Sequence, residues 1–372
     1  MDKVIRIGID TSKSVFVLHG VDDEETPVLR KKLRRRDVAG FLAKLEPTRI
    51  GIEACGAAHH WGRTIAQLGH EVVLLPPQLV KPYVVRNKND RADAEAICEA
   101  MSRPRMRFVP VKTAERQAAQ MLLGLRDRLV RQRTQLTNVI RGYAAEFGLV
   151  AARGLDKIDP LLARIADDPA LPALAKELFA LHGREYAQLM ARLRRVEAEL
   201  MTWHRNDELS RRLAAIPAIG PIGACALSIK VTDPHAFRCG RDFAAWLGLT
   251  PKDHSTAGRQ RLGAITRAGD ETLRSLMVVG ATAVIQQARR QADRASPWLL
   301  ALLARKPPKL AAVALANKTA RIAWRVMVSG EHYDPRHPKP QRPFVSPGAS
   351  VAPCSRRQGR SAPPAAVPCG QP

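Results

Sequence analysis

The sequence predicts a mixed α/β domain, then a long helical linker, then a mainly α-helical domain. Three observations predict this architecture. Short apolar runs alternate with turn residues and helix formers over residues 1–103, apolar residues recur at helical spacing over 104–208, and helical stretches punctuated by Gly and Pro fill 209–334. The last 38 residues, 335–372, include ten prolines and no acid, so we expect a disordered, basic tail.

The first domain begins with strands. Apolar runs at 4–9 and 14–19 flank a turn-prone segment and predict a β-hairpin. Further elements are expected in the order strand, helix, strand, helix, strand and helix, at 27–33, 37–45, 49–52, 58–68, 71–75 and from Asp90 onward. Strands followed by alternating strands and helices are typical of a mixed α/β sheet.

The two later regions are predicted to be helical. Apolar side chains recur three or four residues apart in 112–148 and in 174–204, which predicts two long antiparallel helices. Such a pair is typical of a coiled-coil spacer or dimerisation arm. In the third region, helices are expected at 222–230, 240–247, 270–290 and 309–328.

The chain is strongly basic. It has 60 Lys and Arg against 35 Asp and Glu in 372 residues, a formal net charge of +25. A compact protein with this excess needs a polyanion to compensate it, with nucleic acid as the first candidate and an anionic membrane surface as the second. Residues 30–36 form either a phosphate-binding surface or a solvated strand edge. Their basic members are Arg30, Lys31, Lys32, Arg34, Arg35 and Arg36.

Several classes of protein are excluded. No segment approaches the ~20 consecutive apolar residues of a transmembrane helix, and the N-terminal segment lacks the apolar run of a signal peptide. The six cysteines form no C-x-x-C pair, which argues against zinc-ribbon and thioredoxin-type sites and fits a reducing compartment. We therefore expect a cytoplasmic protein that does not bind membranes.

Four acidic residues stand where a strand ends or a helix begins. Asp10 and Glu53 each follow an apolar strand, while Asp90 and Asp93 lie three residues apart at a predicted helix start. Strand-end acids converge at the carboxyl edge of an α/β sheet, and residues three apart share one helical face. Carboxylates gathered in this way require a cation, and hard oxygen ligands select Mg²⁺ or Mn²⁺. The alternative is that each is an ordinary exposed acid.

These segments carry a family resemblance. IGIDTSK, GIEACG and KNDRADAEAI resemble the Asp-Glu-Asp-Asp signature of RuvC-like insertion-sequence transposases, and FAAWLGLTPKDHSTAGRQRLGAITRAGDETLRSLMVVGA is similar to their partner domain. The resemblance is to the one-hundred-ten insertion-sequence family, eleven-eleven subgroup, and covers residues 4–334. It implies an RNase H-like (RuvC-like) first domain with the four acids as catalytic metal ligands, a coiled-coil linker and a helical transposase domain.

The resemblance also implies a catalytic serine in the third domain. Ser255, in DHSTAG, is the best candidate, and the hydroxyl of Thr256 is the alternative. From chemistry alone, a serine in a polar, Gly-containing loop is more often a turn residue, and its hydroxyl needs a base or a metal to become a strong nucleophile. Three basic residues that could clamp a phosphate follow it, namely Arg259, Arg261 and Arg267.

The expected function is that of a transposase-recombinase that excises and inserts an insertion-sequence element. Ser255 would attack the scissile phosphate at the metal-binding acids and form a covalent intermediate. The resemblance further implies a structured guide RNA, DNA partners at the element ends and target, association with the nucleoid, and a tetramer (a dimer of dimers) whose acids and serine come from different subunits. Two alternatives stay open: a RuvC-like nuclease that hydrolyses DNA junctions with water, and a non-catalytic nucleic-acid-binding protein.

Overall fold

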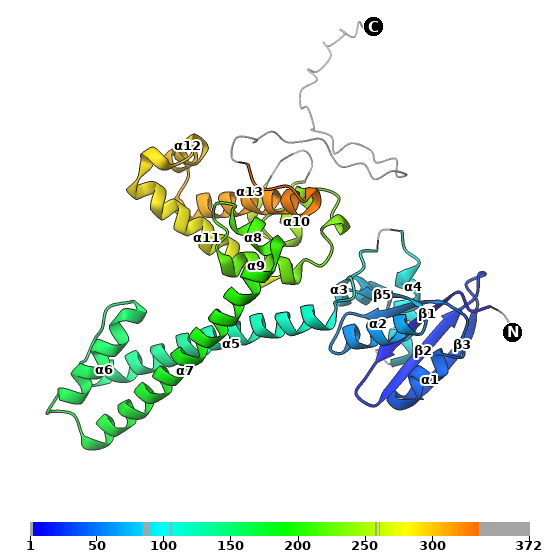
Figure 1. The fold of residues 1–372 in the computed structure, drawn as a ribbon, viewed down its shortest axis with the longest axis horizontal. Coiled ribbons are helices and arrows are strands. Elements are labelled where there is room, and N and C mark those ends of the chain that lie inside the picture. The colour runs from blue at the N-terminus through cyan, green and yellow to red at the C-terminus, as the bar shows by residue number, and fades with distance from the viewer. Residues whose placement is uncertain (1–2, 85–89, 105, 257–258, 260, 335–372) are drawn as a thin grey trace, which may run out of the picture. The chain divides into compact units, whose positions relative to one another are not determined.

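The computed structural model describes residues 3–84, 90–104, 106–256, 259 and 261–334. Up to Tyr333, a β-sheet with its own helices precedes a larger helical part in the chain (Figure 1). The tail predicted to be disordered lies outside the described residues. Among the described residues, no helix combines the length and the apolar character needed to cross a membrane.

The N-terminal part is a five-stranded sheet in the order β3-β2-β1-β4-β5. Its strands are β1 (Arg6–Thr11), β2 (Val15–Val21), β3 (Pro27–Arg34), β4 (Arg49–Glu53) and β5 (Glu71–Leu75). β2 is antiparallel to both of its neighbours, β1 and β3, whereas β1, β4 and β5 run parallel to one another. The five strands and the mixed α/β class predicted for this part are confirmed.

Helices cover both faces of this sheet. Their bounds are α1 (Val38–Leu42), α2 (Ala58–Gln67), α3 (Pro77–Val80) and α4 (Asp90–Met101). On one face, Ile7, Ile9 and Ile52 form a core with α1 and α2, and on the other, Val73 and Leu75 pack with α3 and α4. Side chains alternate between the faces along each strand, so each face has its own core. The short helix α3 was not predicted, because four residues are too few to show helical periodicity.

Two long helices follow the sheet. α5 (Ala114–Glu146) and α7 (Ala173–Asn206) pack against each other over part of their length (Figure 1), and two long helices were predicted here. Thr113 starts α5 by accepting a hydrogen bond from the backbone N–H of Arg116 at 3.3 Å. Between them lies α6 (Ile158–Asp167), which was not predicted although its apolar residues have helical spacing and are buried.

The last part is mainly helical, as predicted. Its helices are α8 (Glu208–Ala214), α9 (Pro221–Lys230), α10 (Gly240–Trp246), α11 (Glu271–Arg290), α12 (Pro297–Arg305) and α13 (Pro308–Ser329). The sequence did not predict α8 or α12, although α12 has a readable start: Ser296 caps it and Pro297 is its first residue. One continuous hydrophobic core runs from α5 and α7 through these helices.

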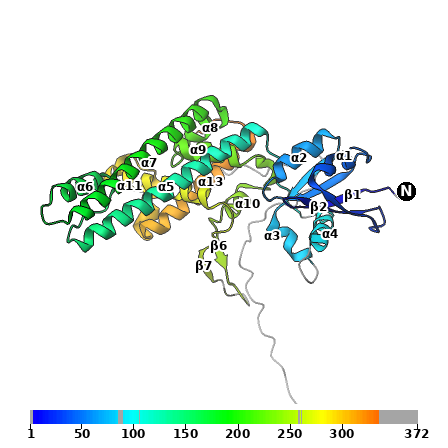
Figure 2. The ribbon, with the colours of Figure 1, turned by 90° about the horizontal axis from the view of Figure 1, so that it is seen from below.

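A small hairpin interrupts this helical part. Strands β6 (Pro251–Asp253) and β7 (Leu262–Ile265) pair antiparallel and extend away from the helices around α10 (Figure 2). The hairpin was not predicted, because its residues are mostly exposed and lack the alternation of apolar and polar side chains that marks a strand.

Candidate active site

The structure brings the four predicted acids together. Asp10 lies in β1 and Glu53 ends the parallel neighbour β4, while Asp90 and Asp93 lie in the first turn of α4. Burial, and then the negative charges of Asp93, Asp90 and Glu53, raise the pKa of Asp10 from 3.8 to about 6. Each acid therefore lies near enough to disfavour ionisation of the Asp10 carboxyl.

A pair of glycines makes this arrangement possible. Gly8 in β1 is paired with Gly51 in β4, and both face α4. A Cβ atom on Gly8 would lie 2.2 Å from the carbonyl oxygen of Ala94, and one on Gly51 would lie 2.0 Å from the sulfur of Met101. The missing side chains let α4 approach the sheet backbone closely. Asp10 and Glu53 lie two residues beyond these glycines on the same face, toward the start of α4.

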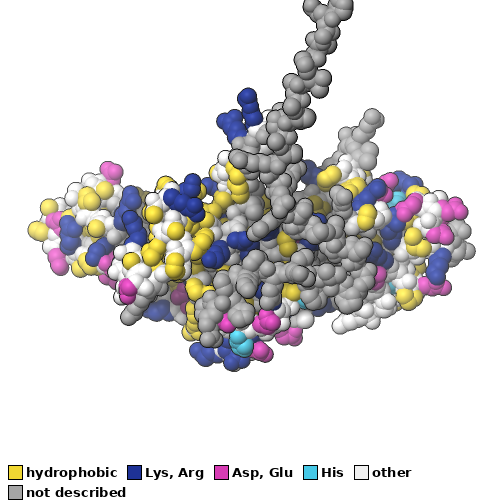
Figure 3. Space-filling model, turned by 90° about the horizontal axis from the view of Figure 1, so that it is seen from above, with side chains coloured by type: hydrophobic (Ala, Val, Ile, Leu, Met, Phe, Trp, Pro, Cys, Tyr) yellow, Lys and Arg dark blue, Asp and Glu magenta, His cyan; other side chains and the backbone are white. Residues whose placement is uncertain are grey.

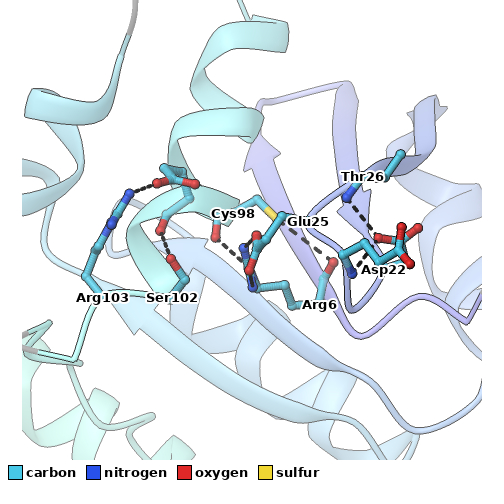
Figure 4. A network of polar contacts seen from close by, with 9 residues as sticks. Arg6, Asp22, Glu25, Thr26, Cys98, Ser102 and Arg103 are labelled. Atoms are coloured by element: carbon cyan, nitrogen blue, oxygen red, sulfur yellow. Dashed lines mark hydrogen bonds and ion pairs between the residues drawn. The ribbon is translucent and has the colours of Figure 1, made fainter.

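A polar network also fixes α4 on the sheet (Figure 4). The buried side chain of Arg6, at the start of β1, donates to the backbone carbonyl of Cys98 in α4 at 3.0 Å. The same guanidinium forms a bidentate ion pair with Glu25 in the turn between β2 and β3, and its hydrogen bonds hold the pKa of Glu25 below its usual range. Asp22 orders that turn by accepting from the backbone N–H of Thr26 at 2.8 Å.

The carboxylates suit a hard divalent cation in chemistry. They supply only oxygen donors, and their mutual repulsion is what a bound cation would relieve. In the part of the chain that the structure describes, however, no three His, Cys, Asp or Glu side chains converge as a ready-made metal shell. To bind an ion, the carboxylates would therefore have to move closer together than they lie in this structure.

Ser255 lies two residues after the end of β6, in the exposed hairpin. Its hydroxyl oxygen accepts a hydrogen bond from the backbone N–H of Arg261 at 3.0 Å, and its own N–H donates to Asp253 Oδ1 at 2.9 Å. Hydrogen bonds from the side chain and the backbone of Ser255 hold the pKa of Asp253 below its usual range. These hydrogen bonds of Ser255 stay within the hairpin, and in the described part of the chain none joins it to the four acids.

The alternative nucleophile and the predicted arginines also lie in or beside this hairpin. The backbone carbonyl of Thr256 accepts from the N–H of Arg259 at 2.9 Å. Arg259, Arg261 and Arg267 are all exposed, and Arg267 has a positive φ of 57°. Their predicted role as a phosphate clamp stays a prediction.

The basic run 30–36 divides between the two faces of the sheet. β3 is an edge strand, and its register pairs Lys32 with Val17, which pairs with Asp10. Cross-strand partners point to the same face, so Lys32, with Arg30 and Arg34 two residues away on either side, faces the side of the acids. Lys31 points the other way and lies 4.3 Å from the ring centroid of Phe41.

The last two residues of this run are partly engaged. Arg35 lies 5.3 Å from the ring of Trp61, and Arg36 forms an ion pair with Asp37 at 3.7 Å. Lys and Arg side chains also gather in several other groups on the face seen in Figure 3.

Comparisons with known proteins agree with this organisation. A model described as "Transposase IS116/IS110/IS902 family" matches residues 210–296, and a second model, described as a transposase, matches residues 7–147. A putative transposase of Sinorhizobium fredii is 63% identical over 334 residues, which cover 90% of this chain and 86% of that protein. The chain belongs to the IS116/IS110/IS902 family of transposases.

Further relatives of this transposase have similar length. A probable family 20 transposase of Pseudomonas aeruginosa is 48% identical over 89% of this chain and 98% of its own. The transposase for insertion sequence element IS1111A of Coxiella burnetii is 38% identical over 88% of this chain and 90% of its own. The protein is thus a transposase of an insertion sequence, an enzyme that acts on DNA, as predicted.

Several residues of this transposase gain a role only from the structure. Gly8, Gly51 and Arg6 hold α4 against the sheet, and Asp253 contacts Ser255. None of these four roles was predicted from the sequence. A signal for Asp253 was available, because Asp followed two residues later by Ser is typical of a turn closed by the Asp side chain. No local sequence pattern marks Gly8 and Gly51 as contact points for α4, since the residues of α4 that they approach lie more than forty positions away in the sequence.

Proposed function

We propose that this transposase cuts and rejoins DNA strands by phosphoryl transfer at Asp10, Glu53, Asp90 and Asp93. The observation that carries the proposal is the placement of the four acids in β1, at the end of β4 and in the first turn of α4. The pKa of Asp10 agrees with it, because burial and then the charges of the other three acids raise that pKa to about 6. Mg²⁺ or Mn²⁺ bound there would stabilise the charge that develops on the attacking and leaving oxygens. An RNase H-like fold of the first domain is part of this proposal, and is supported by three antiparallel strands followed by two parallel ones.

In the proposed reaction, Ser255 is the nucleophile. Its hydroxyl oxygen forms a bond to the scissile phosphorus, its proton is released, and the bond to the leaving strand breaks so that this strand departs as a hydroxyl after taking up a proton. The phosphate is then held as a serine ester, and attack by another strand's hydroxyl reverses these steps and rejoins DNA. Asp253 supports this role because it contacts Ser255 and is ionised at neutral pH, so it can orient the hydroxyl.

Three variants test the chemistry. Asp10→Asn should abolish metal-dependent cleavage of element-end DNA while leaving DNA binding intact. Ser255→Ala should remove any protein–DNA adduct that survives denaturation, and Thr256→Ala should leave it in place. If Ser255→Ala protein still exchanged strands fully, the serine role would be wrong. The second candidate is a RuvC-like nuclease that uses water, and it would be favoured by cleavage without any adduct in the unaltered protein. One observation supports this candidate: the hydrogen bonds of Ser255 stay within its own hairpin.

Guidance by an element-encoded RNA is a further part of the proposal. Exposed cations on the edge strand β3 support it, because such a surface reads the backbone of a nucleic acid rather than its sequence. Base pairing by a guide would then supply the choice of target. Sequencing of RNA that co-purifies with the transposase tests this, and cleavage that is unchanged after ribonuclease treatment would contradict it.

Assembly into a dimer of dimers completes the proposal. Exposed apolar side chains on α7 support self-association: Leu174, Leu178 and Leu181 are spaced four and three residues apart, which places them on one helical face. Self-association through a coiled coil would cover this face and allow acids and serine from different subunits to meet. The mass of the DNA-bound transposase by sedimentation tests it, and a monomer would contradict it.

A further inference from the structure

A group of cations on the helical part has no role in the site described so far. Arg321 and Lys318 lie one turn apart on α13, and Arg241 lies on α10, which packs against α13. The contact is close at this point, since a Cβ atom on Gly240 would lie 3.2 Å from the Cα of Arg321. Lys318 Nζ lies 4.1 Å from the ring centroid of Trp298 on α12. We call Arg241, Lys318 and Arg321 the α13 cation cluster.

The members of the α13 cation cluster lie close enough to repel one another, and among the described residues no carboxylate pairs with them. Burial, and then the charge of Arg241, lower the pKa of Arg321. Burial, and then the charge of Arg321, lower the pKa of Lys318. Among the described residues no carboxylate forms an ion pair with any of the three, whereas Arg325, one turn further along α13, pairs with Glu331 at 3.3 Å. Like charges held together in this way are unfavourable until an anion joins them.

We propose that the α13 cation cluster binds a backbone phosphate of the DNA on which this transposase acts. A phosphate between Arg241 and Arg321 would accept charge-assisted hydrogen bonds from both guanidinium groups, which match its geometry. Trp298 is 37% exposed beside Lys318, and its ring offers an apolar surface to the adjoining sugar or base. The inference rests on the proposed function only in that the DNA strand must pass over the helical part.

DNA is favoured over RNA because the family acts on DNA and this cluster lies outside the basic edge strand for which RNA contacts are proposed. A phosphate contact adds affinity without reading sequence. The site is therefore expected to strengthen binding to unrelated duplexes equally, and to do so through the release of counterions.

The experiment compares Arg321→Gln with Arg325→Gln in the full-length transposase. Affinity for a fluorescein-labelled DNA duplex is measured over a series of KCl concentrations. Arg321→Gln should weaken binding at low salt and reduce the slope of log affinity against log salt by about one, whereas Arg325→Gln should change the slope less because its charge is already paired with Glu331. Arg321→Lys keeps the charge and should keep the slope.

A stability measurement separates binding from folding. Because Arg321 faces other cations, Arg321→Gln should leave the melting temperature of the DNA-free protein unchanged or raise it at low salt. The proposed site would be overturned if Arg321→Gln left the salt slope unchanged or changed it only as much as Arg325→Gln does. A loss of affinity seen only with an RNA hairpin would also overturn it. None of these outcomes depends on cleavage. A result against the α13 cation cluster is therefore distinct from a result against the proposed function, which would be cleavage that persists in Asp10→Asn.

Discussion

At the scale of single residues, Asp10 shows how placing acids close together without a bound cation changes the pKa of one of them. Its pKa of about 6 results first from burial and then from its three acidic neighbours. In the folded protein the carboxyl binds a proton at a pH where the unfolded chain, with a pKa near 3.8, has lost it. At a pH above about 6, the ionised Asp10 therefore lowers the stability of the metal-free folded protein. A bound divalent cation would restore that stability.

Asp10→Asn tests this origin of the pKa shift. Without metal, Asp10 makes the folded protein lose stability as the pH rises from about 4 to about 6, because the unfolded state ionises first. The variant should lack that loss and be more stable than the unaltered protein at pH 7 in EDTA. Urea unfolding at several pH values measures it, with the exposed Asp23→Asn as the control. If both variants followed the pH profile of the unaltered protein, Asp10 would not be the strained group.

At the scale of elements, the close packing of α4 on Gly8 and Gly51, here called the seat of α4, decides whether the acids lie close together. The helix contributes Asp90 and Asp93, but their distance from the sheet is set by Gly8 and Gly51 and by the Arg6 hydrogen bond to Cys98. Packed interiors adjust poorly to added atoms, so this seat should tolerate substitution badly.

Gly8→Ala tests the seat. The new Cβ would meet backbone atoms of Ala94 and Cys98 at 2.2 and 2.5 Å, so α4 must move away from β1. We expect a loss of about 1–3 kcal/mol in the free energy of unfolding, and a loss of metal-dependent cleavage in the fraction that still folds. Gly40→Ala in α1, where a Cβ has open space, is the matched control and should be neutral or slightly stabilising. Equal effects of the two substitutions would refute the close approach.

The edge strand β3 provides another prediction at this scale. Lys32 shares a face with Asp10, and the adjacent Lys31 points to the opposite face and lies over Phe41. If the nucleic acid crosses the sheet on the side of the acids, Lys32→Gln should weaken binding and reduce its salt dependence by about one charge, and Lys31→Gln should have a smaller effect. Fluorescence anisotropy with DNA and with RNA measures both variants. A larger effect of Lys31→Gln would place the strand on the other face.

At the scale of the whole molecule, the net charge of +25 makes binding depend strongly on ionic strength. Each phosphate neutralised by Lys or Arg releases condensed counterions, and the affinity of a protein with 6–10 such contacts falls by about 10³–10⁵ between low and moderate salt. We expect a fall of this order for the transposase, measured as the dissociation constant for a duplex in 50 and 200 mM KCl, conditions that span this range. An affinity independent of salt would contradict binding through the basic surfaces.

The sequence by itself determined the class of each region, the basic surface and the four acids. These follow from local patterns: the period of apolar residues, acids placed after apolar strands, and a large excess of one charge. It missed α3, α6, α8, α12 and the hairpin β6–β7. The helices are short, and even in α6 the helical spacing of apolar residues extends over only ten residues. The hairpin is mostly exposed and lacks the alternation that marks a strand.

Only the tertiary structure decided which groups meet. The pairing of Gly8 with Gly51 beneath α4, the opposite faces taken by Lys31 and Lys32, and the meeting of Arg241 with Arg321 all join segments distant in sequence or depend on strand register. A one-residue change of register would exchange the faces of every side chain in a strand. Local composition cannot fix such choices, because they are set by the packing of the whole fold.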